Sequence, residues 1–227
     1  MRQLPLSVRL PDRAVFASFL PARNAEALQH LKRVAGGGVP GTVWLCGPSG
    51  AGKTHLLQAA CVRAGETMRA GYLPLAEFAA GSVGVLEGLL LECLCLDDLH
   101  QVVGKLEWER ALFALWGEMQ ERQGSLLVAA PAPPALLAWA LPDLASRFAA
   151  SAIFQLRALD ELEQQAALQL RARVRGFELP VETCRWLQRH FPRDMRQLYQ
   201  LLDTLDEAAL AAQRRLTVPF IREVLGR

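Results

Sequence analysis

Eight consecutive residues have the types and spacing of a loop that binds phosphate groups: Gly47, Pro48, Ser49, Gly50, Ala51, Gly52, Lys53 and Thr54. Glycines let a backbone turn so that its N–H groups converge on an anion, and the N-terminus of a following helix adds a favourable dipole. Lys53 would reach the terminal phosphates, and Thr54 would bind Mg²⁺. We therefore expect ADP or ATP with Mg²⁺ as ligands. The expected nucleotide contacts in this stretch are Gly47, Ser49, Gly50, Ala51, Gly52, Lys53, Thr54 and His55.

Two acidic residues follow a later apolar segment. Residues 94–96 predict a buried strand, and Asp97 and Asp98 come directly after it. This places carboxylates at the C-terminal edge of the sheet, beside the expected Mg²⁺. Asp97 would hold the metal, directly or through water, and Asp98 stands where a carboxylate could orient an attacking water. The alternative is a strand that simply ends in two solvated aspartates.

The elements that must position these residues alternate along the chain. Strands are expected at 42–46, 70–73, 94–96, 125–129 and 152–156. Helices are expected at 24–34 with Asn24 as the N-cap, at 52–64, near Ala76, at 83–91 and at 107–120. Four more helices are expected at 160–173, 181–190, 194–212 and 218–225. Strands that alternate with helices predict a parallel sheet covered on both faces, here followed by a helical tail.

Composition narrows the class of protein. The chain has 227 residues, of which 52% are hydrophobic and 21% charged, so we expect a globular protein with a real core. A net charge of +2 is too weak to argue for nucleic acid as a direct ligand. The five cysteines have no metal-site spacing and predict small buried hydrophobes in a reducing, cytosolic compartment. No secretory signal is recognisable, and four prolines in the uncharged run 123–142 exclude a membrane-spanning helix there.

Further motifs carry a resemblance to a known family. They are QLPL at residues 3–6, LPD at 10–12, FASF at 16–19, LPDLASR at 141–147, LQLRAR at 168–173, RGFELP at 175–180 and QRRLT at 213–217. Together with the phosphate loop and the Asp97-Asp98 strand, they resemble the AAA+ ATPases. Within these, the chain resembles the replication initiator DnaA and, more narrowly, the Hda family of regulatory inactivators of DnaA. The motifs run from the first residues to the last helix.

The resemblance implies an architecture. We expect an extended arm at residues 1–12, an AAA+ α/β nucleotide-binding core with a five-stranded parallel sheet at 13–158, and a small all-α lid at 159–227. Residues 16–20 would line the base pocket, as the family's segment there does. The chain stops soon after residue 225, so we expect no additional helix-turn-helix domain of the kind that the initiator uses to bind DNA.

The resemblance also implies roles for single residues. Gln3, Leu4, Pro5 and Leu6 resemble the peptide that docks on the DNA sliding clamp, the β subunit of DNA polymerase III. A Pro-stiffened extended segment of this kind binds at low ordering cost. The sequence alone would favour a loose terminus, and the resemblance reverses that preference. Arg147 resembles an arginine finger, and the alternative is an ordinary surface arginine in a salt bridge. Arg193, and after it Arg196, resemble the sensor-2 region, where a lid arginine contacts the nucleotide; the alternative is an ordinary solvated charge on a helix.

One feature departs from the family pattern. The strand that follows the Asp97 strand usually ends with a polar residue that senses the γ-phosphate, but residues 127–131 here read LVAAP. Alanine cannot orient a water molecule, and Pro131 has no backbone N–H to donate. Asp98 is also shorter than the glutamate common at this position. We therefore expect weak or no intrinsic ATPase, with a bound nucleotide that instead fixes the angle between core and lid.

These inferences predict a negative regulator of DNA replication initiation. The protein would dock on the DNA-loaded clamp, contact DNA mainly through it, and use Arg147 to promote hydrolysis of DnaA-bound ATP in the cytoplasm. The sequence leaves the oligomeric state open; because AAA+ proteins place active sites between subunits, association between copies could bury Arg147 and silence it. The alternatives are an autonomous AAA+ ATPase that loads a helicase or remodels DNA, and a P-loop kinase of a small molecule. No membrane partner is expected.

Overall fold

The computed structural model describes residues 14–191 and 194–226, which divide into two compact units. The first contains residues 14–16 and 23–157, and the second contains residues 17–22 and 158–226. The expected clamp-binding residues Gln3, Leu4, Pro5 and Leu6, and the lid residue Arg193, lie outside the described residues. Among the described residues, no helix has both the length and the apolar character needed to cross a membrane.

The first unit is built on a five-stranded parallel sheet. Its strands are β1 (Gly41–Cys46), β2 (Ala70–Pro74), β3 (Cys93–Asp97), β4 (Ser125–Ala129) and β5 (Ala152–Gln155), in the spatial order β2-β3-β4-β1-β5. The β1 strand therefore pairs with β4 on one side and β5 on the other, and β4 separates it from β3. Since neighbouring strands lie about 4.8 Å apart, the ends of β1 and β3 are separated by roughly 10 Å.

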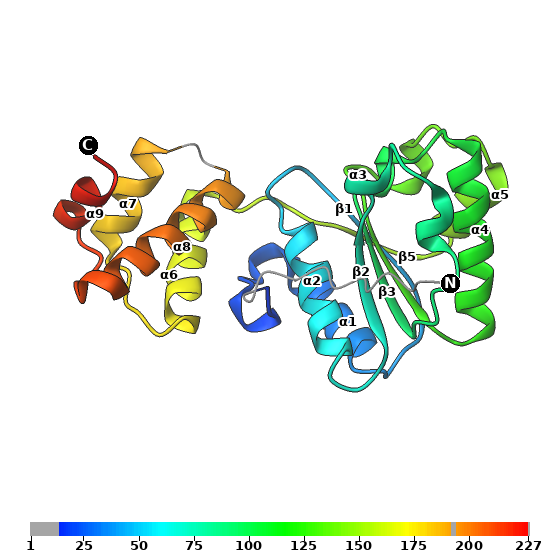
Figure 1. Ribbon diagram of the computed structural model, residues 1–227, viewed down its shortest axis with the longest axis horizontal. Coiled ribbons are helices and arrows are strands. Elements are labelled where there is room, and N and C mark those ends of the chain that lie inside the picture. The colour runs from blue at the N-terminus through cyan, green and yellow to red at the C-terminus, as the bar shows by residue number, and fades with distance from the viewer. Residues whose placement is uncertain (1–13, 192–193, 227) are drawn as a thin grey trace. The chain divides into compact units, whose positions relative to one another are not determined.

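Helices cover both faces of this sheet (Figure 1). They are α1 (Ala25–Ala35), α2 (Lys53–Ala64), the short α3 (Leu75–Phe78), α4 (Leu106–Glu121) and α5 (Pro142–Ala149). Helices α1 and α2 lie on one face, and α4 and α5 lie on the other. The second face is held by one apolar cluster in which Trp44, Leu96 and Val128 of the strands pack with Leu112 of α4 and Phe148 of α5.

The second unit is a bundle of helices: α6 (Glu161–Val174), α7 (Val181–His190), α8 (Met195–Ala212) and α9 (Val218–Val224). It has its own apolar core, to which Leu168, Leu187, Leu198 and Phe220 contribute. The α6 helix begins with a capping box, in which the Asp160 side chain accepts from the Glu163 backbone N–H and the Glu163 side chain accepts from the Asp160 N–H.

Two local predictions need correction, and one helix was not predicted. Asn24 stands at the N-cap position of α1, but its side chain makes no cap; it pairs instead with the backbone of Arg157, 2.9 Å in each direction. Residues 83–91 form only a 3₁₀ turn at Val83–Leu86, because Gly88 follows with a positive φ of 68°. Residues 142–149, for which no element was predicted, form helix α5, with Pro142 in its first turn.

Candidate nucleotide site and exposed arginine

The phosphate loop adopts a backbone that only glycine accepts readily. Gly47, Gly50 and Gly52 have φ values of 142°, 75° and 93°. A Cβ atom at Gly47 would lie 2.4 Å from the backbone oxygen of Leu156, at the end of β5. Glycine is therefore required at Gly47 for two reasons, the positive φ and the close approach of a neighbouring strand.

Neighbouring strands brace the start of the loop through backbone hydrogen bonds. The Gly47 N–H donates to the carbonyl oxygen of Pro131 at 3.2 Å, just beyond the end of β4. On the other side of β1, the Leu156 N–H donates to the Cys46 oxygen at 2.7 Å. The loop thus leaves β1 between two fixed neighbours, and its position follows from the sheet.

The side chain of Lys53 bends back over the loop. Its ammonium donates to the carbonyl oxygens of Gly47 at 2.7 Å and Pro48 at 2.9 Å. Helix α2 begins at Lys53 with Gly52 as its N-cap, so no side chain caps its first turn. The positive end of the helix and the Lys53 ammonium therefore lie together at the C-terminal edge of β1, as binding of phosphate requires.

His55 lies in the first turn of α2, and its side chain contacts the segment that precedes α1. Its Nε2 donates to the carbonyl oxygen of Val15 at 3.0 Å, which ties the chain before the first strand to α2. Phe16 follows Val15, with the Lys32 ammonium 6.0 Å from its ring centroid. Leu20, the last residue of the expected base-pocket segment, packs against the core of the second unit.

Asp97, the expected metal ligand, is a buried carboxylate at the end of β3 and only 2% exposed. Its Oδ2 accepts from the Tyr72 hydroxyl at 2.8 Å, and its Oδ1 accepts from the Asp98 backbone N–H at 3.0 Å. Burial and the nearby Asp97 carboxylate raise the pKa of Tyr72, so the phenol stays protonated and remains a donor. Asp98 is half-buried, with a positive φ of 54°.

The sheet order places the end of β4 between the phosphate loop and Asp97. Ala129 and Ala130 are buried there and carry no polar side chain. The Ala130 N–H donates to the Leu45 oxygen at 3.0 Å, and the Pro131 oxygen accepts from Gly47. This segment therefore contributes to the site through its backbone, by bracing the loop.

The residues that would hold Mg²⁺ suit a hard cation. Thr54 and Asp97 supply oxygen ligands, and phosphate oxygens and water would complete the shell of a bound Mg²⁺–nucleotide. Among the residues that the structure describes, no group of three or more His, Cys, Asp or Glu side chains could hold a metal ion unaided. All five cysteines are buried free thiols, which confirms their interpretation as small hydrophobes.

Arg147 lies on the exposed side of α5. Its guanidinium carbon is 4.9 Å from the ring centroid of Trp116 on α4, within the range of a cation–π contact. Within residues 14–191 and 194–226 it forms no ion pair. The competing interpretation, an arginine held in a surface salt bridge, therefore does not apply among these described residues. Figure 1 shows α5 on the opposite face of the sheet from α2, which begins at the phosphate loop.

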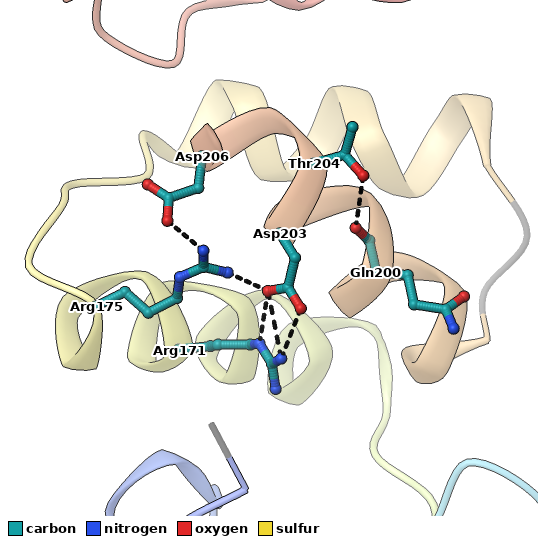
Figure 2. Close-up of polar contacts among 6 residues, drawn as sticks. All are labelled: Arg171, Arg175, Gln200, Asp203, Thr204 and Asp206. Atoms are coloured by element: carbon teal, nitrogen blue, oxygen red, sulfur yellow. Dashed lines mark hydrogen bonds and ion pairs between the residues drawn. The ribbon is translucent and has the colours of Figure 1, made fainter. Parts of the chain in front are cut away.

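The second unit contains a partly buried ionic network between the C-terminal end of α6 and helix α8 (Figure 2). Asp203 accepts from Arg171 at 3.0 Å and from Arg175, which also pairs with Asp206. In addition, the guanidinium carbon of Arg171 lies 4.4 Å from the ring centroid of Tyr199. The network fixes the pairing of the two helices.

The expected sensor residue Arg196 lies on the exposed side of the first turn of α8. Asp194 caps that turn, accepting from the backbone N–H groups of Arg196 at 2.7 Å and Gln197 at 3.3 Å. The start of α8 is therefore well defined, and the Arg196 side chain points to solvent.

This architecture is similar to that of several known proteins. Residues 160–225 match the family model described as the Hda lid domain. Domain III of DnaA from Thermotoga maritima is 21% identical, with a TM-score of 0.76 over 95% of this chain and 97% of that one. AMPPCP-bound DnaA from Aquifex aeolicus is 21% identical, with a TM-score of 0.70 over 88% and 66%. The Holliday-junction branch-migration motor RuvB of T. maritima is 20% identical, with a TM-score of 0.58 over 90% and 67%.

The expected AAA+ fold is thereby confirmed, as is the resemblance to the Hda family and to DnaA. The helical second unit therefore resembles the Hda lid domain, and the chain as a whole shares the fold of domain III of DnaA. Tyr72 and Trp116 had no predicted role, nor had Glu109, a buried residue of α4 whose carboxylate accepts from the backbone N–H groups of residues 104, 140 and 141. Their sequence positions carry no motif, and their importance comes from partners on other elements.

Proposed function

We propose that this protein is a negative regulator of replication initiation that promotes hydrolysis of ATP bound to DnaA. Arg147 would act as an arginine finger on the partner's nucleotide. The observation that carries this proposal is the guanidinium itself: it is exposed, has no ion pair among the described residues, and lies on the sheet face opposite α2. An arginine in this position is better placed to contact a nucleotide on a neighbouring molecule than a nucleotide in the phosphate loop of the same chain.

The chain's own nucleotide would have a structural role. ADP or ATP would bind to the loop through Gly47, Ser49, Gly50, Ala51, Gly52, Lys53, Thr54 and His55, with Mg²⁺ on Thr54 and Asp97. Asp98 is the candidate to orient water. Because Ala129 and Ala130 offer no polar side chain, we expect weak or no hydrolysis there. Arg193 and Arg196 would contact the nucleotide from the lid.

The N-terminal residues would bring the protein to its target. Gln3, Leu4, Pro5 and Leu6 form the proposed docking peptide for the sliding clamp, so DNA would be contacted mainly through the clamp. Likeness to the Hda lid domain and to DnaA supports a cytoplasmic replication partner for this chain. Association between copies of the chain would bury Arg147 and silence it.

A hydrolysis assay with clamp-loaded DNA and ATP-bound DnaA tests the proposal. We expect wild type to stimulate hydrolysis, and Arg147→Ala to lose roughly 10³-fold or more of the effect, the scale on which arginine fingers act. Arg110→Ala, which removes an exposed arginine from α4, is the matched control and should retain stimulation. Both variants should still bind ADP. Full stimulation by Arg147→Ala would show that the assignment of the finger is wrong.

The same assay separates the alternative function. An autonomous ATPase that loads a helicase or remodels DNA would turn over ATP by itself, without DnaA, and lose turnover in Lys53→Ala. The proposal expects negligible turnover by the isolated chain, and expects Lys53→Ala to lose nucleotide binding. Gln3→Ala should weaken clamp binding and leave nucleotide binding unchanged.

A further inference from the structure

We propose that Glu109 and Trp116, both on α4, hold helix α5 at two points and thereby set the position of Arg147. We call this pair the α4 seat. The inference rests on the proposed function of Arg147, because it assigns residues that position the finger. Neither residue would touch the partner's ATP, so both are positioning residues.

Glu109 is the first point of the α4 seat. Its carboxylate is fully buried, at 0% exposure, and three backbone N–H groups donate to it. Oε1 accepts from Gly104 at 2.6 Å and Ala140 at 3.1 Å, and Oε2 accepts from Leu141 at 2.6 Å. Leu141 is the N-cap of α5. A buried carboxylate is costly unless it is hydrogen-bonded, so this arrangement fixes the start of α5 against α4.

Trp116 is the second point. It lies seven residues after Glu109, almost two full helical turns, and so on the same side of α4. Its indole Nε1 is buried and has no hydrogen-bond partner in the described parts of the chain. The face of its ring contacts Arg147, with the guanidinium carbon 4.9 Å from the ring centroid.

Apolar packing joins the two points. Leu112 of α4 and Leu144 and Phe148 of α5 belong to one buried cluster, with exposures of 1%, 0% and 0%. Helix α5 is thus held at its start by Glu109, along its length by the core, and near its end by Trp116. An arginine held in advance loses less rotamer freedom when it engages a phosphate. This is why we expect the α4 seat to affect the rate of the chemical step.

Fluorine NMR of the full chain tests the placement without any partner. Labelling with 5-fluorotryptophan gives five tryptophan signals, and the one lost in Trp116→Phe belongs to Trp116. Arg147→Ala should shift that signal, whereas Arg110→Ala on the same helix as Trp116 should not. Glu109→Gln should also shift it, because an amide presents N–H groups where the carboxylate accepted them. An unchanged Trp116 signal in folded Glu109→Gln would overturn the first point of the seat.

Stimulation of DnaA-bound ATP hydrolysis tests the second point, and does so even where Glu109→Gln fails to fold. Trp116→Phe keeps an aromatic face and should stay within about twofold of wild type, whereas Trp116→Leu should lower the maximal rate about fivefold or more. The concentration that gives half-maximal stimulation should not change, because positioning acts on the bound complex. A Leu variant as active as wild type, or Phe and Leu variants equally impaired, would contradict the proposal.

The two assays separate this inference from the function on which it rests. If Arg147→Ala stimulates hydrolysis as well as wild type does, the proposed function is wrong, and the fluorine spectra alone decide whether the α4 seat holds Arg147. If Arg147→Ala is inactive while Glu109→Gln and Trp116→Leu are folded and fully active, the finger stands and the α4 seat is wrong.

Discussion

Single side chains at the C-terminal edge of the sheet are held by partners from neighbouring strands. Asp97 of β3 shares a hydrogen bond with Tyr72 of β2, and the strand register explains how they meet, since Pro74 pairs with Asp97 and Tyr72 with Cys95. The phenol donates to one carboxylate oxygen and leaves both oxygens with lone pairs for a cation or its water. We interpret Tyr72 as the residue that orients the proposed metal ligand.

Removal of the Tyr72 hydroxyl should therefore weaken Mg²⁺-dependent nucleotide binding. Partners that orient a metal ligand typically contribute 10- to 100-fold in metal affinity, so we expect Tyr72→Phe to lower ADP affinity about tenfold in Mg²⁺. ADP affinity in EDTA should stay unchanged. Calorimetry under both conditions measures the difference. Tyr199→Phe in the lid, the other tyrosine of the chain, is the matched control, and an equal loss with and without Mg²⁺ would refute the orienting role.

The roles of single residues could be predicted from the sequence where the functional residues are neighbours along the chain. The phosphate loop is one unbroken motif, and Asp97 is marked by the strand before it. Tyr72 could not be recognised, because its partner depends on the pairing of β2 with β3. Glu109 looks in sequence like Glu107 and Glu118 on the same helix. Only the fold brings the N–H groups of residues 140 and 141 to it.

At the scale of elements, the loop between β1 and α2 depends on glycine to different extents along its length. Gly47 has a φ of 142°, and a Cβ atom there would meet the backbone oxygen of Leu156 at 2.4 Å. Gly50 has a φ of 75°, and a Cβ atom there would have no neighbouring atom within 4 Å. The loop is therefore tightest where it leaves the sheet.

This difference predicts unequal costs for two alanine substitutions. Gly50→Ala should lower the free energy of unfolding by about 1 kcal/mol, from the positive φ alone. Gly47→Ala should cost at least about 2–3 kcal/mol, because β5 must also move away. Urea titrations followed by circular dichroism compare the two. Equal losses would show that the contact with Leu156 relaxes freely.

The lid offers a second prediction at this scale. Asp203→Ala removes the shared partner of Arg171 and Arg175, and should lower the free energy of unfolding by about 1–3 kcal/mol. We expect the lower half of that range, because the Asp203 side chain is 29% exposed. The control is Glu223→Ala, which breaks an exposed pair with Arg214 and should cost less than about 1 kcal/mol. Similar losses would mean that the network adds nothing beyond surface charge pairing.

Element types followed from sequence more reliably than their details. The five strands and the four lid helices are where apolar periodicity predicts them, within a residue or two at their ends. Asn24 shows the limit: local pattern gives its N-cap position, but the backbone of Arg157, far along the chain, captures its side chain. Helix α5 was missed although Pro142, Leu144 and Phe148 give the pattern of a short amphipathic helix.

In the molecule as a whole, we propose that this chain binds a nucleotide whereas the hydrolysed ATP is bound elsewhere. The phosphate loop of this chain would hold a nucleotide beside the end of β4, where Ala129 and Ala130 offer no polar side chain. Arg147 is exposed on α5, which lies on the sheet face opposite to helix α2. Likeness to the Hda lid domain and to DnaA supports a partner of the same fold. The central claim is therefore that the ATP which is hydrolysed belongs to DnaA.

Single-turnover hydrolysis with label on one protein at a time tests this claim most directly. ATP labelled at the γ-phosphate is bound either to DnaA or to this chain, and the two proteins are then mixed with clamp-loaded DNA and excess unlabelled nucleotide. We predict labelled phosphate only when the label starts on DnaA, and its loss with Arg147→Ala. Release only from label bound to this chain, or undiminished release with Arg147→Ala, would contradict the account.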